Sequence, residues 1–229
     1  KVIGMSDPEG FLIHHRPNRY VGQLGISHAD FDLQIGILKQ IAEGNHPSAS
    51  LGVPQTSLQN ARWSKGFYEH PRPEIFPLIP TDAKTVLSIG CGSGEAETAL
   101  QAAGFLVTVL PLDSVIGSVA EQRGLAVIHG SLEESLRALN DREFDVILVT
   151  NLLHLFEHPV SILADCTARL APRGVLITVG PNFEQLPIRL KKILGKGEFG
   201  QLRTYRASGI NAFSLSRLRR WDASAGLHT

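Results

Sequence analysis

The residues best suited to chemistry form a glycine turn, Gly90-Cys91-Gly92-Ser93-Gly94, which is followed by Glu95. Glycines let a backbone turn sharply and let a ligand approach without meeting a Cβ atom. A dinucleotide fingerprint has the spacing G-x-G-x-x-G and seats a pyrophosphate at a helix N-terminus. Here the spacing is G-x-G-x-G, and an acidic residue at the helix start opposes a pyrophosphate. The turn therefore disfavours a pyrophosphate ligand and is compatible with S-adenosylmethionine (SAM), which has no phosphate and carries cationic groups; an ordinary strand-to-helix connection is the other interpretation.

The elements around this turn follow a strand–turn–helix order. Residues 85–89 form a short apolar run that predicts a buried strand, and residues 95–103 have apolar residues at helical spacing before Gly104. Further strands are predicted at residues 105–110, 126–129, 144–150 and 175–179, and further helices at 114–122, 132–139 and 159–170. Such alternation specifies a parallel sheet with helices on both faces. We therefore expect an α/β fold, a Rossmann-like, doubly wound, mostly parallel sheet.

Length and composition set the domain organisation. The chain has 229 residues, of which 43% are hydrophobic, enough for one α/β domain and a modest extension. We expect residues 1–80 to form an N-terminal helical extension or cap, with helices at 30–43 and 58–69. Residues 81–229 should form the SAM-binding domain, with a basic insertion at 183–212.

Charge and cysteine content narrow the partners. The formal net charge is zero, which argues against general nucleic-acid binding, because that affinity comes largely from phosphate neutralisation. No apolar run approaches the ~18 residues of a membrane span. The two cysteines suit neither a metal site nor a disulfide framework. We expect no metal, no membrane partner and a cytoplasmic location.

The sequence resembles a known enzyme family. Residues 85–100, TVLSIGCGSGEAETAL, resemble motif I of the class I SAM-dependent methyltransferases, usually written [V/L]LD[I/V]GCG[T/S]G. Residues 144–182 resemble the motif IV to motif VI region of small-molecule methyltransferases of the ubiquinone-biosynthesis type, and the likeness covers about residues 66–227. The resemblance implies SAM as cofactor and methyl transfer to a small-molecule acceptor at oxygen, for example a sugar, a glycan precursor or a secondary metabolite.

The sequence departs from the family pattern at several positions. Ser88 replaces the acid that usually precedes the glycine turn, and Pro111 stands where an acid that binds the ribose is expected. His154-Leu155 replaces a frequent Glu-His pair, and the sequence ends where the sixth strand of the family sheet should begin. A SAM-binding module without catalysis is therefore the alternative. An NAD-binding oxidoreductase is less favoured, because the glycine spacing differs.

The expected cofactor site lies beyond the carboxyl ends of the strands, where open α/β sheets bind ligands. Asp113 is a candidate acceptor for the ribose hydroxyls, although an acid at this position also suits the start of a helix. Residues 130–132 should edge the adenine, and residues 151–153 should lie along the cofactor. The full set of candidate cofactor-binding residues is Ser88, Gly90, Cys91, Gly92, Gly94, Asp113, Gly130, Ser131, Leu132, Asn151 and Leu152.

A hydroxyl acceptor needs a base to take its proton. His154 follows the fourth strand closely enough to face the methyl group, and His158 is the second candidate, since its place before Pro159 also fits a helix cap. A structural role for both histidines is equally open. We expect the aromatic residues of 63–68 and the basic residues of 189–206 to line the acceptor pocket, where the basic residues could orient an anionic acceptor. A solvated face is an equally open interpretation of these basic residues. The oligomeric state is left open.

Overall fold

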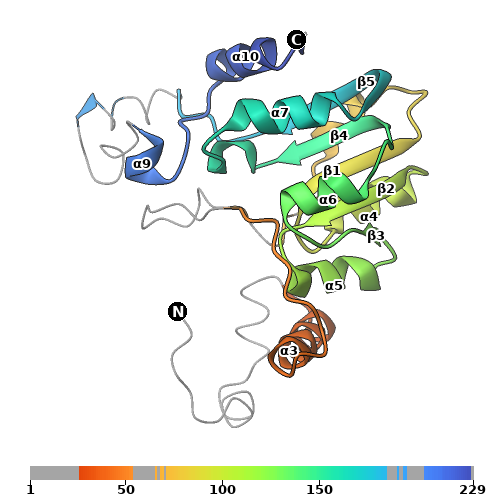
Figure 1. Ribbon diagram of the computed structural model, residues 1–229. Helices are drawn as coiled ribbons and strands as arrows, with labels where there is room; N and C mark the ends of the chain where they lie inside the picture. Colours follow the sequence, from red (N-terminus) through yellow and green to blue (C-terminus); the bar gives the residue numbers. More distant parts are fainter. Residues whose placement is uncertain are drawn as a thin grey trace. The chain divides into compact units, whose positions relative to one another are not determined.

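The computed structural model (Figure 1) describes residues 26–53, 65, 68–69, 71–184, 190, 193–194 and 204–227. These residues fall into two compact units that divide between Pro47 and Ser48. The predicted helix at 58–69 and most of the basic insertion lie outside the described residues. The predicted acceptor pocket between residues 63–68 and 189–206 therefore stays a prediction.

The described part of the first unit contains one long helix, α3 (His28–Ala42). The hydroxyl of Ser27 accepts a hydrogen bond from the backbone N–H of Asp30 at 3.1 Å, which caps the helix N-terminus. Gly44, with φ of +75°, follows its C-terminus. This is the helix that the sequence predicts over residues 30–43.

The second unit is built on a five-stranded parallel sheet with the order β3-β2-β1-β4-β5 (Figure 1). The order reverses between β1 and β4, which creates a switch point at their carboxyl ends. The predicted Rossmann-like, doubly wound, parallel fold is confirmed. The strands are β1 (Thr85–Cys91), β2 (Leu106–Pro111), β3 (Ala126–Val127), β4 (Phe144–Thr150) and β5 (Leu170–Val179).

Helices flank the sheet, and most begin where a polar side chain can cap them. Ser131 and Glu134 form a reciprocal capping box: the Glu134 N–H donates to the Ser131 hydroxyl, and the Ser131 N–H donates to the Glu134 carboxylate. The described helices of this unit are α4 (Glu95–Ala102), α5 (Ser114–Gln122), α6 (Leu132–Ala138), α7 (Pro159–Thr167), α9 (Tyr205–Ser208) and α10 (Leu215–Ser224). Two short 3-10 helices complete the described elements, η2 (Pro73–Leu78) and η3 (Leu153–Leu155). None of the helices in the described part of the chain combines the length and apolar character that a membrane crossing requires.

The core is centred on β1 and β4, which lie next to each other in the middle of the sheet. Val86, Leu87, Val146, Ile147 and Val149 are completely buried. Strands covered by helices on both faces need apolar residues at successive positions, which explains the continuous apolar runs in the sequence. The switch point thus lies at the carboxyl ends of two largely buried strands of the sheet.

β5 is longer than the sequence predicts. Pro172, Arg173 and Gly174 signal a turn, but in the structure they lie inside the strand as an irregularity, with Arg173 at φ of +71°. The register confirms it, because Leu170 pairs with Phe144 and Val175 pairs with Val146. The extra residues on one strand form a bulge rather than an end.

Residues 48–53, which we call the crossing segment, run over the carboxyl end of β2. The N–H of Leu51 donates to the carbonyl of Leu112 at 2.9 Å, and the N–H of Ser114 donates to the carbonyl of Ala49 at 2.9 Å. The Ala49 N–H in turn donates to the Ser114 hydroxyl at 2.9 Å. Residues 48–53 are thus hydrogen-bonded to the end of the sheet, and Leu51 is only 2% exposed.

Candidate functional site

The glycine turn connects β1 to α4 at the switch point. Gly90 and Gly94 have φ of +79° and +84°, in the left-handed region that favours glycine. A Cβ atom on Gly90 would lie 2.6 Å from a methyl carbon of Leu152, and one on Gly94 would lie 2.6 Å from a methyl carbon of Leu125. The backbone conformation thus favours glycine at both positions, and a side chain at either one would force a leucine side chain to move.

Arg123, the residue that follows α5, holds the glycine turn from the side. Its Nη1 donates to the carbonyl oxygen of Ser93 at 2.9 Å and to the Ser93 hydroxyl at 3.2 Å. Its Nη2 lies 4.0 Å from a carboxylate oxygen of Glu95. The sequence does not predict a role for this residue, because nothing in the local pattern links Arg123 to a turn thirty residues earlier in the chain.

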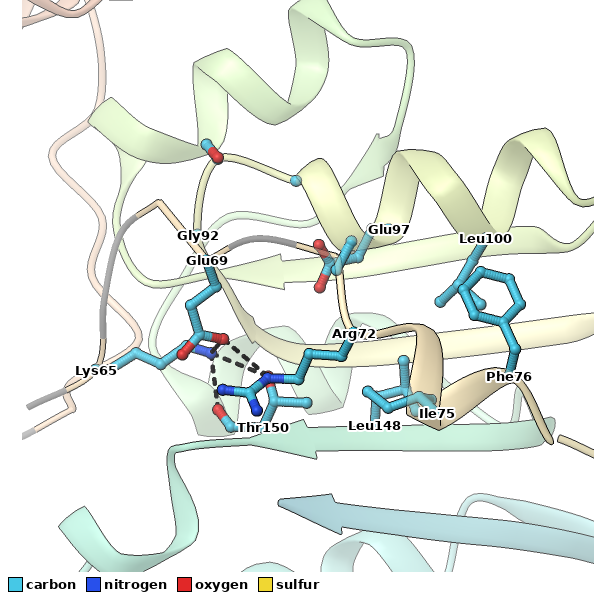
Figure 2. Close-up of a pocket in the computed structure, with 13 residues that line it drawn as sticks. Lys65, Glu69, Arg72, Ile75, Phe76, Gly92, Glu97, Leu100, Leu148 and Thr150 are labelled. Atoms are coloured by element: carbon cyan, nitrogen blue, oxygen red, sulfur yellow. Dashed lines mark hydrogen bonds and ion pairs between the residues drawn. The ribbon is translucent and has the colours of Figure 1, made fainter. Parts of the chain in front are cut away.

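A pocket opens between the glycine turn, α4 and the carboxyl end of β4 (Figure 2). Gly92 and Gly94 line it, as do residues from the segment that precedes β1. Its apolar wall includes Ile75, Phe76 and Leu148. Its polar and charged side chains include those of Lys65, Glu69, Arg72, Glu97 and Thr150.

Lys65 and Glu69 form an ion pair anchored on the end of β4. Lys65 is buried, and its Nζ donates to Glu69 at 2.6 Å, to the Thr150 carbonyl at 2.7 Å and to the Thr150 hydroxyl at 3.0 Å. The side-chain amide of Asn151 donates to the other Glu69 oxygen at 2.9 Å. Asn151 has φ of +48°, a conformation that asparagine tolerates better than most residues. The pair therefore fixes the loop that follows β4.

Arg72 brings a cationic group to the pocket. Its Nη1 lies 3.7 Å from the exposed carboxylate of Glu74. Its Nε is buried and has no hydrogen-bond partner among the described residues. A buried donor without a partner is uncommon and costs free energy. An anionic group in the pocket would satisfy it.

Glu97 brings a carboxylate to the same pocket. Its Oε1 accepts a hydrogen bond of 2.6 Å from the hydroxyl of Ser88, and both residues are buried. Burial raises the pKa of the Cys91 thiol well above its ordinary value, and the nearby Glu97 carboxylate raises it further. Cys91 therefore stays protonated, and its Sγ donates to the Gly92 carbonyl at 3.3 Å.

The candidate ribose and adenine residues lie beside the crossing segment rather than in this pocket. Asp113 caps α5, because its Oδ1 accepts hydrogen bonds from the N–H groups of Val115 and Ile116 at 2.8 and 2.9 Å. The N–H of Leu132 donates to the carbonyl of Leu51 at 3.2 Å. None of Asp113, Gly130, Ser131 and Leu132 lines the pocket beside the glycine turn. The observed role of Asp113 is the helix cap that the sequence left open, and its contact with ribose stays a prediction.

The two histidines proposed as bases have different surroundings. His154 lies in η3, is 1% exposed, and its carbonyl accepts a hydrogen bond from Asn211 at 2.7 Å. His158 is exposed at the N-cap position of α7, where its side chain makes no capping hydrogen bond. Neither residue lines the pocket beside the glycine turn. Within the described residues, no group of three His, Cys, Asp or Glu side chains could hold a metal ion.

A protein-family model matches the larger part of the chain. The family described as "Methionine biosynthesis protein MetW" matches residues 72–208, more than half of the chain. The match includes the glycine turn, the sheet and most of the described pocket.

Curated relatives have methyltransferase names. The ubiquinone biosynthesis O-methyltransferase of Histophilus somni is 37% identical over 113 residues, which cover 44% of this chain and 47% of the relative. The protein of the same name from Haemophilus ducreyi is 33% identical over 118 residues, which cover 45% and 50%. The trans-aconitate 2-methyltransferase of Methylobacterium nodulans is 28% identical and covers 72% and 67%. The chain spans about half the length of the ubiquinone-biosynthesis relatives that it matches.

Solved structures share the fold at low sequence identity. A SAM-dependent methyltransferase from Archaeoglobus fulgidus aligns with a TM-score of 0.53 and 15% identity over 67% of this chain and 65% of that one. A SAM-dependent methyltransferase from Thermotoga maritima, described as a possible histamine N-methyltransferase, aligns with a TM-score of 0.50 and 19% identity over 68% and 69%. These comparisons confirm the predicted resemblance to class I SAM-dependent methyltransferases, and SAM is the cofactor named for these structures.

Proposed function

Since the chain belongs to the family described as methionine biosynthesis protein MetW, we propose that it is a SAM-dependent methyltransferase acting on a small molecule. The single observation that carries this proposal is the pocket at the switch point of the sheet, between the glycine turn and the end of β4. Open α/β sheets bind their ligands at this place.

The residues of the pocket fit the amino-acid end of SAM. The buried Nε of Arg72 lacks a hydrogen-bond acceptor among the described residues, and a carboxylate can supply one. Gly92 and Gly94 present backbone without side chains on the pocket wall, so that a ligand can approach closely. When bound, SAM supplies a methyl group on a sulfonium, which is the electrophile in methyl transfer.

The chain's own residues would position and enclose that group. Arg123 fixes the glycine turn, and the pair of Lys65 and Glu69 fixes the loop after β4. Apolar side chains such as Phe76 and Leu148 exclude water from the pocket wall. Methyl transfer depends mainly on positioning and on exclusion of water, so these roles are the ones expected of the protein.

We propose oxygen as the acceptor atom. The names of the relatives from Histophilus somni and Haemophilus ducreyi, which are O-methyltransferases, support this assignment. A hydroxyl acceptor needs a base, for which His154, in η3 and four residues beyond the end of β4, stays the proposed residue. An anionic acceptor is part of the same proposal. So is a cytoplasmic location, with which the free thiols of Cys91 and Cys166 agree.

A SAM-binding module without catalysis is the second candidate. The carboxylate of Asp113, the candidate ribose ligand, is used in the cap of α5, and the crossing segment lies against the same loops. Both observations favour a site that binds the ribose of SAM differently from the family pattern.

Calorimetry and a turnover assay test the proposal together. Titration should give heat with SAM and with S-adenosylhomocysteine, and none with NADH. Formation of S-adenosylhomocysteine in the presence of candidate hydroxyl acceptors separates an enzyme from a binding module. A folded protein that binds neither SAM nor S-adenosylhomocysteine contradicts both candidates.

A further inference from the structure

Glu97 is a buried carboxylate held in one position. It lies in the first turn of α4 and is 7% exposed. The hydroxyl of Ser88, which is 2% exposed in the middle of β1, donates to its Oε1 at 2.6 Å. Hydrogen bonds from a hydroxyl to a carboxylate are short and strong at such distances. Ser88 therefore fixes the direction in which Glu97 points.

The charge of Glu97 has no counter-charge in the described part of the protein. No Lys, Arg or His nitrogen of the described residues forms an ion pair with its carboxylate within 4.0 Å. A buried carboxylate costs free energy unless it is paired, and a serine hydroxyl supplies no positive charge. Because Glu97 lines the pocket, a cationic ligand in that pocket can supply the missing charge.

The pocket also contains cationic side chains. Because these would repel a simple cation, a ligand that carries both a positive and a negative group suits the pocket better. Lys65 is paired with Glu69, whereas Arg72 has a buried Nε without a partner among the described residues. Figure 2 shows Glu97 on α4 and the side chains of Lys65 and Arg72 on the segment before β1, all lining the one pocket. An α-amino acid group carries an ammonium and a carboxylate on the same carbon, and so matches both groups at once.

We propose that Glu97, oriented by Ser88, binds the ammonium of the amino-acid end of SAM and makes the pocket selective for ligands with a free α-amino group. The proposal rests on the proposed function, because it assigns a further binding residue to the same cofactor. Glu95, the other acid at the start of α4, is a suitable control, since it lies near Arg123 and does not line the pocket.

The test compares two ligands that differ only in the ammonium: S-adenosylhomocysteine and its deaminated analogue, which keeps the carboxylate. Calorimetry measures both affinities in the wild type, Glu97→Gln, Ser88→Ala and Glu95→Gln. In the wild type, S-adenosylhomocysteine should bind at least about 30-fold more tightly than the analogue, as expected for a desolvated charge pair. In Glu97→Gln the ratio should fall to about 1–3. The variant loses the charge pair with the ammonium of S-adenosylhomocysteine, whereas the analogue has no ammonium and makes no such pair in the wild type.

The two remaining variants make the assignment specific. Ser88→Ala should lower the ratio by about 3–10-fold, since it removes one hydrogen bond to the carboxylate but keeps the charge. Glu95→Gln should leave the ratio within about twofold of the wild type, because surface charges are screened.

The ratio within one variant cancels any general disturbance of the pocket. A ratio in Glu97→Gln equal to that of the wild type overturns the proposal, and so does an equal loss of affinity for both ligands. A wild type that binds neither ligand contradicts the proposed function instead. If Glu97→Gln does not fold, as judged by circular dichroism, Glu97→Asp takes its place: the shorter carboxylate should reduce the ratio by about tenfold, and an unchanged ratio rejects the assignment.

Discussion

The guanidinium of Arg123 donates to the backbone carbonyl of Ser93 at 2.9 Å and so joins the end of α5 to the middle of the glycine turn. Ser93 is buried, and the second hydrogen bond, to its hydroxyl, fixes the side chain as well. The shape of the turn therefore depends on a side chain from the next helix as well as on its own glycines.

Replacement of this side chain should weaken cofactor binding without unfolding the protein. We expect Arg123→Ala to lower the affinity for S-adenosylhomocysteine by about 5–30-fold, because the turn loses two charge-assisted hydrogen bonds. Calorimetry measures the affinity, and circular dichroism checks the fold. Arg137→Ala is the control, because Arg137 pairs with Glu133 on the exposed face of α6. Equal affinity in the Arg123 variant and the wild type would show that the glycines alone shape the turn.

The glycine at the end of β1 should be intolerant of a side chain. A Cβ on Gly90 meets Leu152 at 2.6 Å, whereas a Cβ on Gly104, which also has a positive φ, meets nothing within 4 Å. We expect Gly104→Ala to lower the free energy of unfolding by about 1–2 kcal/mol through backbone strain alone. Gly90→Ala should lose about 1–3 kcal/mol more through overpacking, as measured by urea denaturation. Equal losses in the two variants would mean that Leu152 moves aside at no cost.

The crossing segment should contribute to the stability of the sheet. Leu51 is buried against it, so Leu51→Ala should lower the free energy of unfolding by about 2–5 kcal/mol. Leu106→Ala is the control, because Leu106 is 70% exposed and its replacement should change stability by less than about 0.5 kcal/mol. Urea denaturation of both variants gives the comparison. A loss of under about 1 kcal/mol at Leu51 contradicts a bound segment.

Acid should destabilise the protein partly through Asp145. Hydrogen bonds from the backbone N–H groups of Lys84 and Thr85 lower the pKa of this carboxyl from its usual 3.8. A group whose pKa is lower in the folded state adds stability above its unfolded pKa, and that stability is lost as the pH falls through the folded pKa. We therefore expect the free energy of unfolding to decline below about pH 4.

The variant Asp145→Asn should show a weaker decline over the same pH range, because its amide does not titrate. Denaturation at pH 3, 4, 5 and 7 measures the difference. Asp141→Asn, at an exposed position in the loop before β4, is the matched control and should follow the wild type. A parallel decline in Asp145→Asn and the wild type would assign the acid sensitivity to other carboxyls.

The sequence predicts the sheet well because its signals are local. α5 and β4 have the predicted bounds, since each is set by a cap or by an apolar run within a few residues. The glycine turn is also predicted, because its spacing and its place after a strand are visible in the sequence. The exception is β5, where Pro172 and Gly174 mark a turn by composition but form a bulge that pairing with β4 keeps in the strand.

The pocket is harder to predict because its polar groups meet only in the folded chain. Glu97 looks like one more acid at the start of a helix, and only the packing of α4 on β1 brings it to Ser88. Lys65 and Glu69 have the spacing of an ordinary helical ion pair, and their contact with Thr150 depends on a segment 81 or more residues away in sequence. Patterns of residue type show which groups can react, but they do not show which tertiary contacts orient those groups.

The crossing segment also bears on where the protein can be cut. A fragment that begins at residue 81 would keep every strand of the sheet and every helix that connects the strands. It would nevertheless remove the backbone partners of Leu112 and Ser114 and the buried side chain of Leu51. A fragment that keeps these contacts therefore starts at Ser48 or earlier, at a boundary that the repeating strand–helix pattern does not mark.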